Sequence, residues 1–419
     1  MNPISKLVTG FDKTLRGLNM KFKKTLALLL SSVLFVGVLA GCSSNSSKSN
    51  GNSSSNGKTV IKIATQTPLS GGSAIIGEAI KLGAQLKLEQ ESDKFKELGF
   101  TLQLEPYDDQ ADPKKGVSNA NLIGADKQIY GVIGHYNSGV AIPSSEVYEK
   151  YHIAMVSPAN TAVDVTDRGL KTVNRIVGRD DFQGPAGAEY AVETLKAKKI
   201  FIIQDKTAYG SGLAKEFKAA AEKLGAQIVG YEGITVGEKD FNGVINKAKT
   251  TNPDVLYFGG IYAEGGLIIK QAREKGINVP IMGGDGMDSS GLVDIAGDKV
   301  ANTYITSVAG DSTTTESGKK FIEEYKAKFN KQPESYSVYG YDAMGVYLQG
   351  LENAIKANNN KLPTKEAVAE AVRSIKDFKG ALTNVSFDDK GDNANAKIYL
   401  YKFDKASYPA VLEAEINKK

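Results

Sequence analysis

The sequence predicts an α/β fold made of two doubly wound parallel-sheet lobes, and three features of the chain support this. Apolar runs of strand length alternate with amphipathic helical stretches from Thr59 onward, which is typical of parallel strands buried on both faces. The alternation forms two separate series, and the second begins near residue 180. The segments that follow the strands are rich in Gly, Ser and Thr, as expected where parallel sheets bind ligands.

The first series provides four strands and the helices between them. The expected strands are residues 60–64, 100–104, 129–133 and 153–156. Apolar residues recur at helical spacing over residues 76–94, which predicts a long helix after the first strand. Asp112 and Pro113 are the residue types that cap and begin a helix, so the next helix is expected to begin there.

The second series repeats this pattern. The expected strands are residues 199–203, 227–229, 255–258 and 279–282, and the expected helices are residues 210–224, 240–248 and 264–275. In such sheets, ligands bind at the carboxyl ends of the strands. The segments at those ends are Ser70–Gly72, His135–Ser138, Ser157–Thr161, Tyr209, Gly259–Tyr262 and Gly283–Asp285. Gly lets the backbone approach a ligand, while hydroxyls and free N–H groups at helix starts hold a carboxylate.

Composition excludes several classes of function. With 419 residues, of which 41% are hydrophobic, two domains are expected. Six of the 52 basic and one of the 48 acidic residues precede Cys42, so the rest of the chain is nearly neutral and no nucleic-acid partner is expected. Cys42 is the only cysteine, which excludes an intrachain disulfide and a multi-cysteine zinc site. We expect no metal and no cofactor, a site at His135 or His152 being the alternative.

The usual motifs of catalysis are absent. The chain contains no G-x-G-x-x-G after its first strand, no G-x-x-x-x-G-K-[ST] and no G-x-S-x-G, so we expect no enzyme activity. Hydrolysis using His135 beside Ser138 is one alternative, and His135 as an inert residue at a strand end is the other. Asp108-Asp109 and Asp388-Asp389 are expected to be solvated turn residues.

The N-terminal segment has the character of an export signal. Three lysines at positions 21–24 precede an apolar run over residues 26–39 that is short for a membrane span. The run ends in Leu-Ala-Gly-Cys42, which resembles the bacterial lipobox. The resemblance implies a signal peptide over residues 1–41, with Met20 as the expected start, and acylation of Cys42, for example by palmitate. The alternative is a buried cysteine in a membrane helix.

Residues 42–58 combine the lipidated cysteine with a Ser/Asn-rich stretch that lacks apolar side chains. Such a stretch cannot bury surface and is expected to be a flexible tether. Two or three acyl chains give stable anchoring. The expected localisation is therefore the extracytoplasmic face of the cell membrane.

Six motifs carry a resemblance to a known family. They are YDDQADPKKGVSNAN (107–121), VIGHYNSG (132–139), VSPANT (156–161), DKTAYGSGLA (205–214), GITVGEKDF (233–241) and YFGGIYAEGG (257–266). Their order and spacing resemble those of the branched-chain amino acid binding proteins of ABC transporters, from Ile61 to about Asp298 and more weakly beyond. The resemblance implies a type I periplasmic-binding-protein fold. It also implies Leu, Ile or Val as ligand, an ABC permease as partner and a monomeric state.

The resemblance also implies roles for residues of the first series. Ser138 lies where the family holds the ligand carboxylate with a hydroxyl and an amide. Thr161 lies where a threonine serves both carboxylate and ammonium, and Ala159 lies where a carbonyl accepts from the ammonium. Helix N-capping is the structural alternative for Ser138 and Thr161 and is compatible with binding.

Residues of the second series complete the implied site. Tyr262 matches a tyrosine near the carboxylate, Tyr209 lines the cleft, and Asp285 lies where the family usually has a glutamate facing the ammonium. A zwitterion needs donors on one side and a carboxylate on the other. A charge pair at about 4 Å contributes on the order of 4 kcal/mol at an effective dielectric constant near 20, before desolvation. The alternative for Asp285 is an ordinary turn residue.

Two departures leave the ligand's identity open. Ile76 lies where close family members have an aromatic residue against the ligand side chain, and Asn137 replaces a frequent cysteine. The alternatives are therefore the same fold with another amino acid, an amide or an organic acid as ligand, a sensor ectodomain, or an enzyme.

The resemblance finally implies how the lobes are divided. Residues 59–180 and 309–384 are expected to form the N-terminal lobe, and residues 181–308 and 385–419 the C-terminal lobe. The hinge is expected in three crossovers, near residues 179–182, 307–312 and 382–388. Closure of such a hinge around a ligand is a known property of periplasmic binding proteins.

Overall fold

The structure is a computed structural model that describes residues 59–417. The predicted signal peptide, Cys42 and nearly all of the predicted tether lie outside the described residues. The described chain forms a mixed α/β fold with two large sheets, which confirms the predicted fold class. Each predicted strand overlaps a strand of the structure.

The first sheet is entirely parallel, in the order β2-β1-β3-β4-β5. Its strands are β1 (Thr59–Thr67), β2 (Phe100–Asp108), β3 (Ile129–Gly134), β4 (Ala154–Ser157) and β5 (Val173–Arg175). Every residue of β3 and β4 is buried, as expected for strands covered by helices on both faces.

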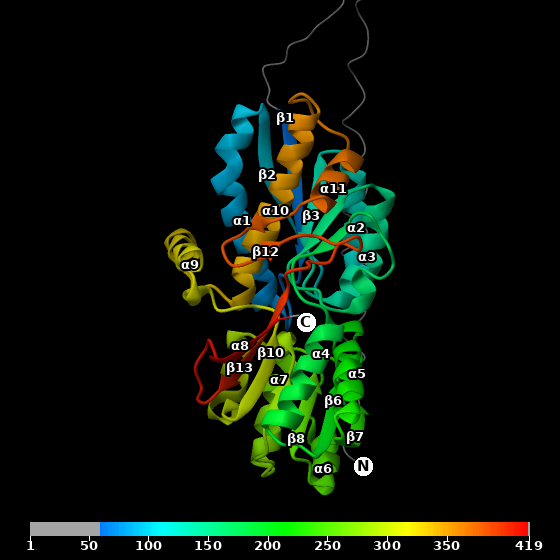
Figure 1. Ribbon diagram of the computed structural model, residues 1–419, viewed down its shortest axis with the longest axis vertical. Coiled ribbons are helices and arrows are strands. Elements are labelled where there is room, and N and C mark those ends of the chain that lie inside the picture. The colour runs from blue at the N-terminus through cyan, green and yellow to red at the C-terminus, as the bar shows by residue number, and fades with distance from the viewer. Residues whose placement is uncertain (1–58, 418–419) are drawn as a thin grey trace, which may run out of the picture. The chain divides into compact units, whose positions relative to one another are not determined.

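Six helices pack on or beside this sheet. They are α1 (Ala74–Glu97), α2 (Pro113–Ala125), α3 (Ser138–Lys150), α9 (Glu316–Phe329), α10 (Ser335–Ala357) and α11 (Lys365–Arg373). As predicted, α2 begins at Pro113, and Asp112 caps it by accepting from the N–H of Lys115. Helices α1 and α10 lie side by side (Figure 1) and approach closely, because an added Cβ at Gly83 would lie only 1.9 Å from the Ser337 carbonyl oxygen. We call this sheet with its helices the N-lobe.

The second sheet has the order β14-β13-β10-β9-β8-β6-β7. Its strands are β6 (Lys199–Gln204), β7 (Gln227–Gly233), β8 (Val255–Gly259), β9 (Ile281–Gly283), β10 (Thr303–Ser307), β13 (Lys397–Phe403) and β14 (Val411–Asn417). The strands β6 to β10 are parallel, whereas β13 and β14 join the edge in antiparallel pairing. The sheet is therefore mixed, because the chain returns to it from α11 and adds a hairpin.

Five helices accompany the second sheet, and together they are the C-lobe. They are α4 (Asp180–Glu189), α5 (Ala208–Lys223), α6 (Asn242–Thr251), α7 (Tyr262–Glu274) and α8 (Ser290–Ala296). The shorter elements of the fold are η1 (Val163–Val165), η2 (Tyr190–Thr194), η3 (Asp285–Met287), η4 (Gly297–Val300), η5 (Ser312–Thr314), β11 (Phe378–Lys379) and β12 (Asn384–Val385).

The chain passes between the two sheets three times: between β5 and α4, after β10, and between β12 and β13. A buried ion pair joins the first passage to the third. Arg175 is fully buried, and its Nε lies 2.5 Å from Asp392 Oδ1. Arg179 Nη1 lies 2.8 Å from the other oxygen of the same carboxylate. Two crossing segments are thereby tied at one point.

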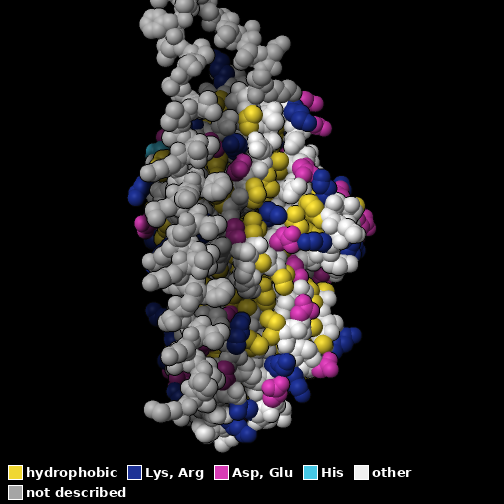
Figure 2. All heavy atoms as spheres, turned by 180° about the vertical axis from the view of Figure 1, so that it is seen from behind, with side chains coloured by type: hydrophobic (Ala, Val, Ile, Leu, Met, Phe, Trp, Pro, Cys, Tyr) yellow, Lys and Arg dark blue, Asp and Glu magenta, His cyan; other side chains and the backbone are white. Residues whose placement is uncertain are grey.

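Two surface properties agree with the composition. Among residues 59–417, no helix is long and apolar enough to cross a membrane. On the described part of the face shown in Figure 2, basic and acidic side chains are interspersed. This mixture fits the nearly equal numbers of basic and acidic residues after Cys42.

Candidate functional site

The candidate site is a cleft of about 620 Å³ lined by loops of both lobes. The N-lobe contributes the loops that follow β1, β2, β3 and β4, and the C-lobe contributes those that follow β6, β7, β8 and β9. These are the carboxyl ends of parallel strands, where the sheet topology leaves a crevice. The cleft thus lies where the sequence pattern placed the ligand.

Four of the six predicted site residues line this cleft. They are Ser138, Ala159, Tyr209 and Asp285. Thr161 is fully buried next to the cleft rather than on its wall, and its hydroxyl has no hydrogen-bond partner among the described residues. Such a buried hydroxyl is unusual, because most buried polar atoms are hydrogen-bonded.

Tyr262 takes a different position. It begins α7, and its ring packs where an added Cβ at Gly291 would meet it at 2.6 Å. Its hydroxyl bonds to the backbone of Ile75, and burial raises its pKa to about 12. The residue on the wall of the cleft is instead its neighbour Ile261, because successive residues at a helix start point in different directions.

Ser138 lies at the N-terminus of α3. Its hydroxyl accepts from the N–H of Ala162 at 3.4 Å, and the first N–H groups of the helix have no intrahelical carbonyl partner. Asn137 precedes the helix as N-cap residue, but its side chain makes no capping bond and its Oδ1 has no partner. This end of the cleft therefore offers donors and a positive helix terminus, which suit a carboxylate.

A buried amide fixes the two N-lobe loops that carry Ser138 and Ala159. Asn160 Oδ1 accepts from the N–H of His135 at 3.1 Å and from the Ser157 hydroxyl at 2.8 Å. Asn160 Nδ2 donates to the carbonyl of Tyr136 at 2.9 Å. The loops after β3 and β4 are thereby held in one arrangement.

His135 is buried beneath these loops. Its Nδ1 lies 3.4 Å from Asp109 Oδ2 and its Nε2 lies 3.2 Å from the Tyr148 hydroxyl. The imidazole is fully buried and is not on the cleft wall, so this geometry favours the inert alternative over hydrolysis with Ser138. Asp109 is also fully buried, so its prediction as a solvated turn residue was wrong. Asp388 and Asp389 are exposed, as predicted.

Asp285 is the centre of a buried hydrogen-bond network. Tyr209 donates to Oδ1 at 2.9 Å, and Tyr336 donates to Oδ2 at 2.6 Å. The N–H of Gly286 donates to the Tyr209 hydroxyl at 2.8 Å. Burial raises the pKa of Asp285, and the hydrogen bond from Tyr336 opposes that shift. Although Asp285 opens the short turn η3, it is not a solvated turn residue.

Sequence reasoning missed Tyr336. It lies on α10 of the N-lobe, so its bond to Asp285 crosses between the lobes. Tyr136 makes a second crossing contact, because its hydroxyl lies 3.5 Å from the Gly286 carbonyl. No local motif marks Tyr336; the available signal was only an aromatic residue at the start of a long helix.

Two further residues have positions that the pattern did not give. Ile76, predicted to face the ligand side chain, is fully buried in the hydrophobic core and does not line the cleft. Two acidic residues do line it: Asp205, whose pKa burial raises to about 6, and Glu264, whose Oε2 is buried without a partner.

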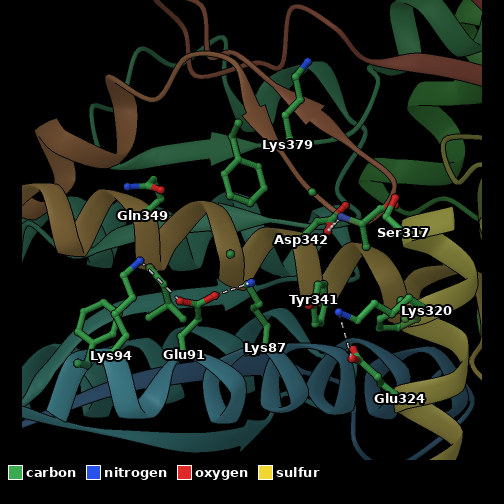
Figure 3. A pocket seen from close by; sticks show the side chains of 17 residues that line it. Lys87, Glu91, Lys94, Ser317, Lys320, Glu324, Tyr341, Asp342, Gln349 and Lys379 are labelled. Carbon is green, nitrogen blue, oxygen red and sulfur yellow. Dashed lines mark hydrogen bonds and ion pairs between the residues drawn. The ribbon is translucent and has the colours of Figure 1, made fainter. Parts of the chain in front are cut away.

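A groove of about 350 Å³ on the N-lobe is a competing hollow, bordered by α1, α9, α10 and the segment after β11 (Figure 3). Its charges are largely paired with one another: Lys87 lies 2.7 Å from Glu91, and Lys320 lies 3.7 Å from Glu324. Asp342 is bound by three backbone N–H groups. The groove is not at the carboxyl ends of the strands, so the interlobe cleft is the better candidate. Among residues 59–417, no group of His, Cys, Asp and Glu could hold a metal ion.

Comparison with known proteins places this geometry in context. A family model described as periplasmic binding protein matches residues 60–407. The Leu/Ile/Val-binding protein homolog 1 of Brucella abortus is 37% identical over 347 residues, which cover 83% of this chain and 91% of that protein. The Leu/Ile/Val-binding protein BraC3 of Rhizobium johnstonii is 37% identical over 344 residues, which cover 82% and 92%.

Solved structures show the same fold. A leucine-binding protein from Thermotoga maritima superposes with a TM-score of 0.78 at 30% identity, covering 85% of this chain and 99% of that one. A branched-chain amino acid transporter substrate-binding protein from Streptococcus pneumoniae, solved with isoleucine, gives a TM-score of 0.76 at 26% identity, covering 86% and 99%. With its two sheets, its interlobe cleft and these matches along most of its length, the chain belongs to the periplasmic binding protein family.

Proposed function

We propose that this chain is the extracytoplasmic substrate-binding lipoprotein of an ABC importer. It captures a branched-chain or other apolar amino acid between its lobes and delivers it to the permease. The observation that carries the proposal is the cleft itself, which has a helix N-terminus and a serine at one end and a buried carboxylate at the other. The names of the relatives in Brucella and Rhizobium support the same ligand class.

The two ends of the cleft match the two charges of an amino acid. Ser138 and the N-terminus of α3 receive the carboxylate, while the Ala159 carbonyl, Thr161 and Asp285 receive the ammonium. The Asp285 oxygens each accept one phenolic bond, and each retains capacity for a second acceptor contact. Tyr209 orients this carboxylate from the C-lobe.

The space between these ends suits an aliphatic side chain. Val140, Val236, Ile261 and Ala263 contribute apolar surface to the cleft. Burying a side chain of the size of leucine contributes about 1.5–3 kcal/mol. The charged ends therefore select an amino acid, and the apolar wall selects an aliphatic one.

Ligand binding is proposed to stabilise the closed arrangement of the lobes. The contacts that join them include Tyr336 with Asp285 and the pair of Ser290 with Glu334, whose oxygens lie 2.5 Å apart. A ligand that touches both lobes adds to these contacts only when the lobes are closed. Tyr262 is proposed to act in this closure through its bond to Ile75 rather than on the ligand carboxylate.

The lobe limits and the hinge stay as predicted: residues 59–180 with 309–384, residues 181–308 with 385–419, and crossovers near 179–182, 307–312 and 382–388. The Arg175–Asp392 pair, which joins two crossings, supports a hinge at this place.

The N-terminal proposals concern anchoring. Acylation of Cys42, removal of residues 1–41 and a tether over 42–58 would hold a monomer at the outer face of the cell membrane, next to its permease. Expression in a bacterium fed an alkyne-tagged palmitate tests this. Label should appear on the wild-type protein and disappear in Cys42→Ala, whereas label that persists in the variant would contradict lipidation there.

The proposed ligand class is tested by calorimetric titration with the twenty amino acids. Leu, Ile or Val should bind most tightly, and a 2-keto acid analogue of leucine should bind far more weakly. A protein that binds none of the apolar amino acids would contradict the proposal.

A second candidate is the same fold with a ligand that carries a polar side chain. The unpartnered Oε2 of Glu264 on the cleft wall favours it, because a buried acceptor without a donor is costly. In the same titration, tightest binding of an amide-bearing or amine-bearing amino acid would select this candidate.

A further inference from the structure

The carboxylate of Asp180 is buried without a partner. The residue is 1% exposed, and neither of its side-chain oxygens has a hydrogen-bond partner among the described residues. Buried carboxylates are normally paired or hydrogen-bonded, because an unpaired buried charge is strongly unfavourable. The protein therefore leaves a strong acceptor unused at this place.

The cations closest in the fold are committed elsewhere. Arg175 donates to Asp392, to the carbonyls of Asn160 and Ala162, and to the Thr166 hydroxyl. The neighbouring Arg179 is paired with Asp167, Asp181 and Asp392. Neither arginine forms an ion pair with Asp180, so the missing partner must come from outside the chain.

Asp180 lies beside the proposed ammonium site. Its backbone N–H donates to the carbonyl of Thr161 at 2.9 Å. The Thr161 hydroxyl, itself without a partner, lies near the carboxylate but outside hydrogen-bond geometry. Asp180 is also close enough to Asp285 and Tyr209 to influence their charges, and both of those residues line the cleft.

The unsatisfied atoms at this place are all acceptors or able to accept. They are both oxygens of Asp180, the hydroxyl oxygen of Thr161 and Oε1 of Gln183. Asp285 differs, because phenolic hydroxyls already bond both of its oxygens. An ammonium group has three donors and no acceptor, so it is the complement of this acceptor cluster.

We infer that Asp180 is a second ligand-binding carboxylate, which holds the ammonium group of the bound amino acid together with the Thr161 hydroxyl. The inference rests on the proposed function and deepens it, because it names the group that selects amino acids over their deaminated analogues. Asp180 begins α4 directly after the first crossing, whereas Thr161 belongs to the N-lobe. The same contact therefore joins the ligand to both sides of a hinge segment.

The test is titration of Asp180→Asn with L-leucine and with 4-methyl-2-oxopentanoate, which lacks the amine. The asparagine keeps the size of the side chain and removes its charge. Leucine binding should weaken by roughly 100-fold, the loss expected when one partner of a buried charge pair is removed. The keto acid should bind as tightly as to the wild type, or more tightly, because no ammonium is lost.

Asp181→Asn is the matched control. Asp181 is the next residue of the same helix, and its exposed carboxylate faces Arg179. Its change should alter leucine affinity less than about twofold. Equal weakening of both ligands by Asp180→Asn would assign Asp180 a structural role and overturn the inference.

The remaining outcomes separate this inference from the proposed function. If the wild type binds leucine and Asp180→Asn binds it equally well, only the inference fails. If the wild type binds no amino acid, the proposed function itself fails. If Asp180→Asn does not fold, a crystal structure of wild type with leucine decides: the inference expects the ligand nitrogen within about 3.2 Å of an Asp180 oxygen, and a longer separation overturns it.

Discussion

The two lobes contribute opposite chemistry to one cleft. The N-lobe half presents Ser138, the amide of Asn137 and the N-terminus of α3, none of which is negatively charged. The C-lobe half presents the carboxylates of Asp205, Glu264 and Asp285. A zwitterion can satisfy both halves in only one orientation, so the difference between the lobes fixes how an amino acid must lie.

The difference also has a consequence for stability. The polar groups of the N-lobe half are neutral and do not titrate, whereas the C-lobe buries several carboxyl groups whose pKa values are raised. Such groups favour the folded state in acid and oppose it at neutral pH. The C-lobe half is therefore the part of the molecule that should respond to pH.

The largest effect is expected at Asp288, next to the C-lobe half of the cleft. Burial raises its pKa from 3.8 to about 7, although the Ser307 hydroxyl bonds it at 2.7 Å. Between pH 4 and 7 the unfolded chain loses this proton while the folded chain keeps it, so the residue's contribution to stability falls as pH rises. The full loss is about 4 kcal/mol, from about 1.4 kcal/mol for each pH unit.

Asp288→Asn should remove that loss. Urea unfolding from pH 4 to 8 is expected to show a smaller decline for the variant than for the wild type, and greater stability of the variant at pH 8. Parallel curves for the two proteins would show that Asp288 is ionised in the folded state, contrary to this account.

Asp285→Asn should have the next largest effect, on the affinity for leucine. The change removes a buried charge opposite the ligand's ammonium, and a loss of about 3 kcal/mol, or more than 100-fold, is expected. Calorimetry measures it, with the exposed C-lobe residue Asp294 changed to Asn as the control. Unchanged affinity in Asp285→Asn would remove the proposed polarity of the C-lobe half.

Tyr336→Phe tests the contact between the halves. Its hydroxyl donates to Asp285 from the opposite lobe, and a hydrogen bond to a charged group contributes about 1.5–3 kcal/mol. The dissociation rate of leucine in stopped-flow displacement should rise about 20-fold, because the bond is lost from the closed form. The control is Tyr341→Phe on the same helix, whose hydroxyl bonds Gln90; an equal change in both variants would argue against a specific interlobe role.

Ser138→Ala should have the smallest effect. It removes one neutral donor from the N-lobe half and leaves the helix terminus in place, so a loss of about 1 kcal/mol in leucine affinity is expected. Leucinamide, which lacks the carboxylate, should bind both proteins equally. A loss of the same size for leucinamide would show that Ser138 does not contact the carboxylate.

The sequence pattern predicted the framework better than the side chains around the ligand. Buried runs such as residues 129–133 marked the strands, and the crevice rule then located the loops with Ser138, Ala159 and Asp285. These features depend on local hydrophobicity and on topology, both of which can be read along the chain.

The missed features depend on tertiary contacts. Tyr336 reaches Asp285 from a helix of the other lobe, and Asp180 is unpaired only because both nearby arginines bond elsewhere. The exchange of Ile261 for Tyr262 on the cleft wall reflects the exact start of α7. Sequence spacing alone contains none of these directions.

The most direct test of the account is a crystal structure of the protein bound to L-leucine. The account predicts the ligand in the interlobe cleft, with its carboxylate at Ser138 and the start of α3 and its nitrogen toward Thr161 and the C-lobe carboxylates. A ligand in the opposite orientation, or one bound outside this cleft, would contradict it.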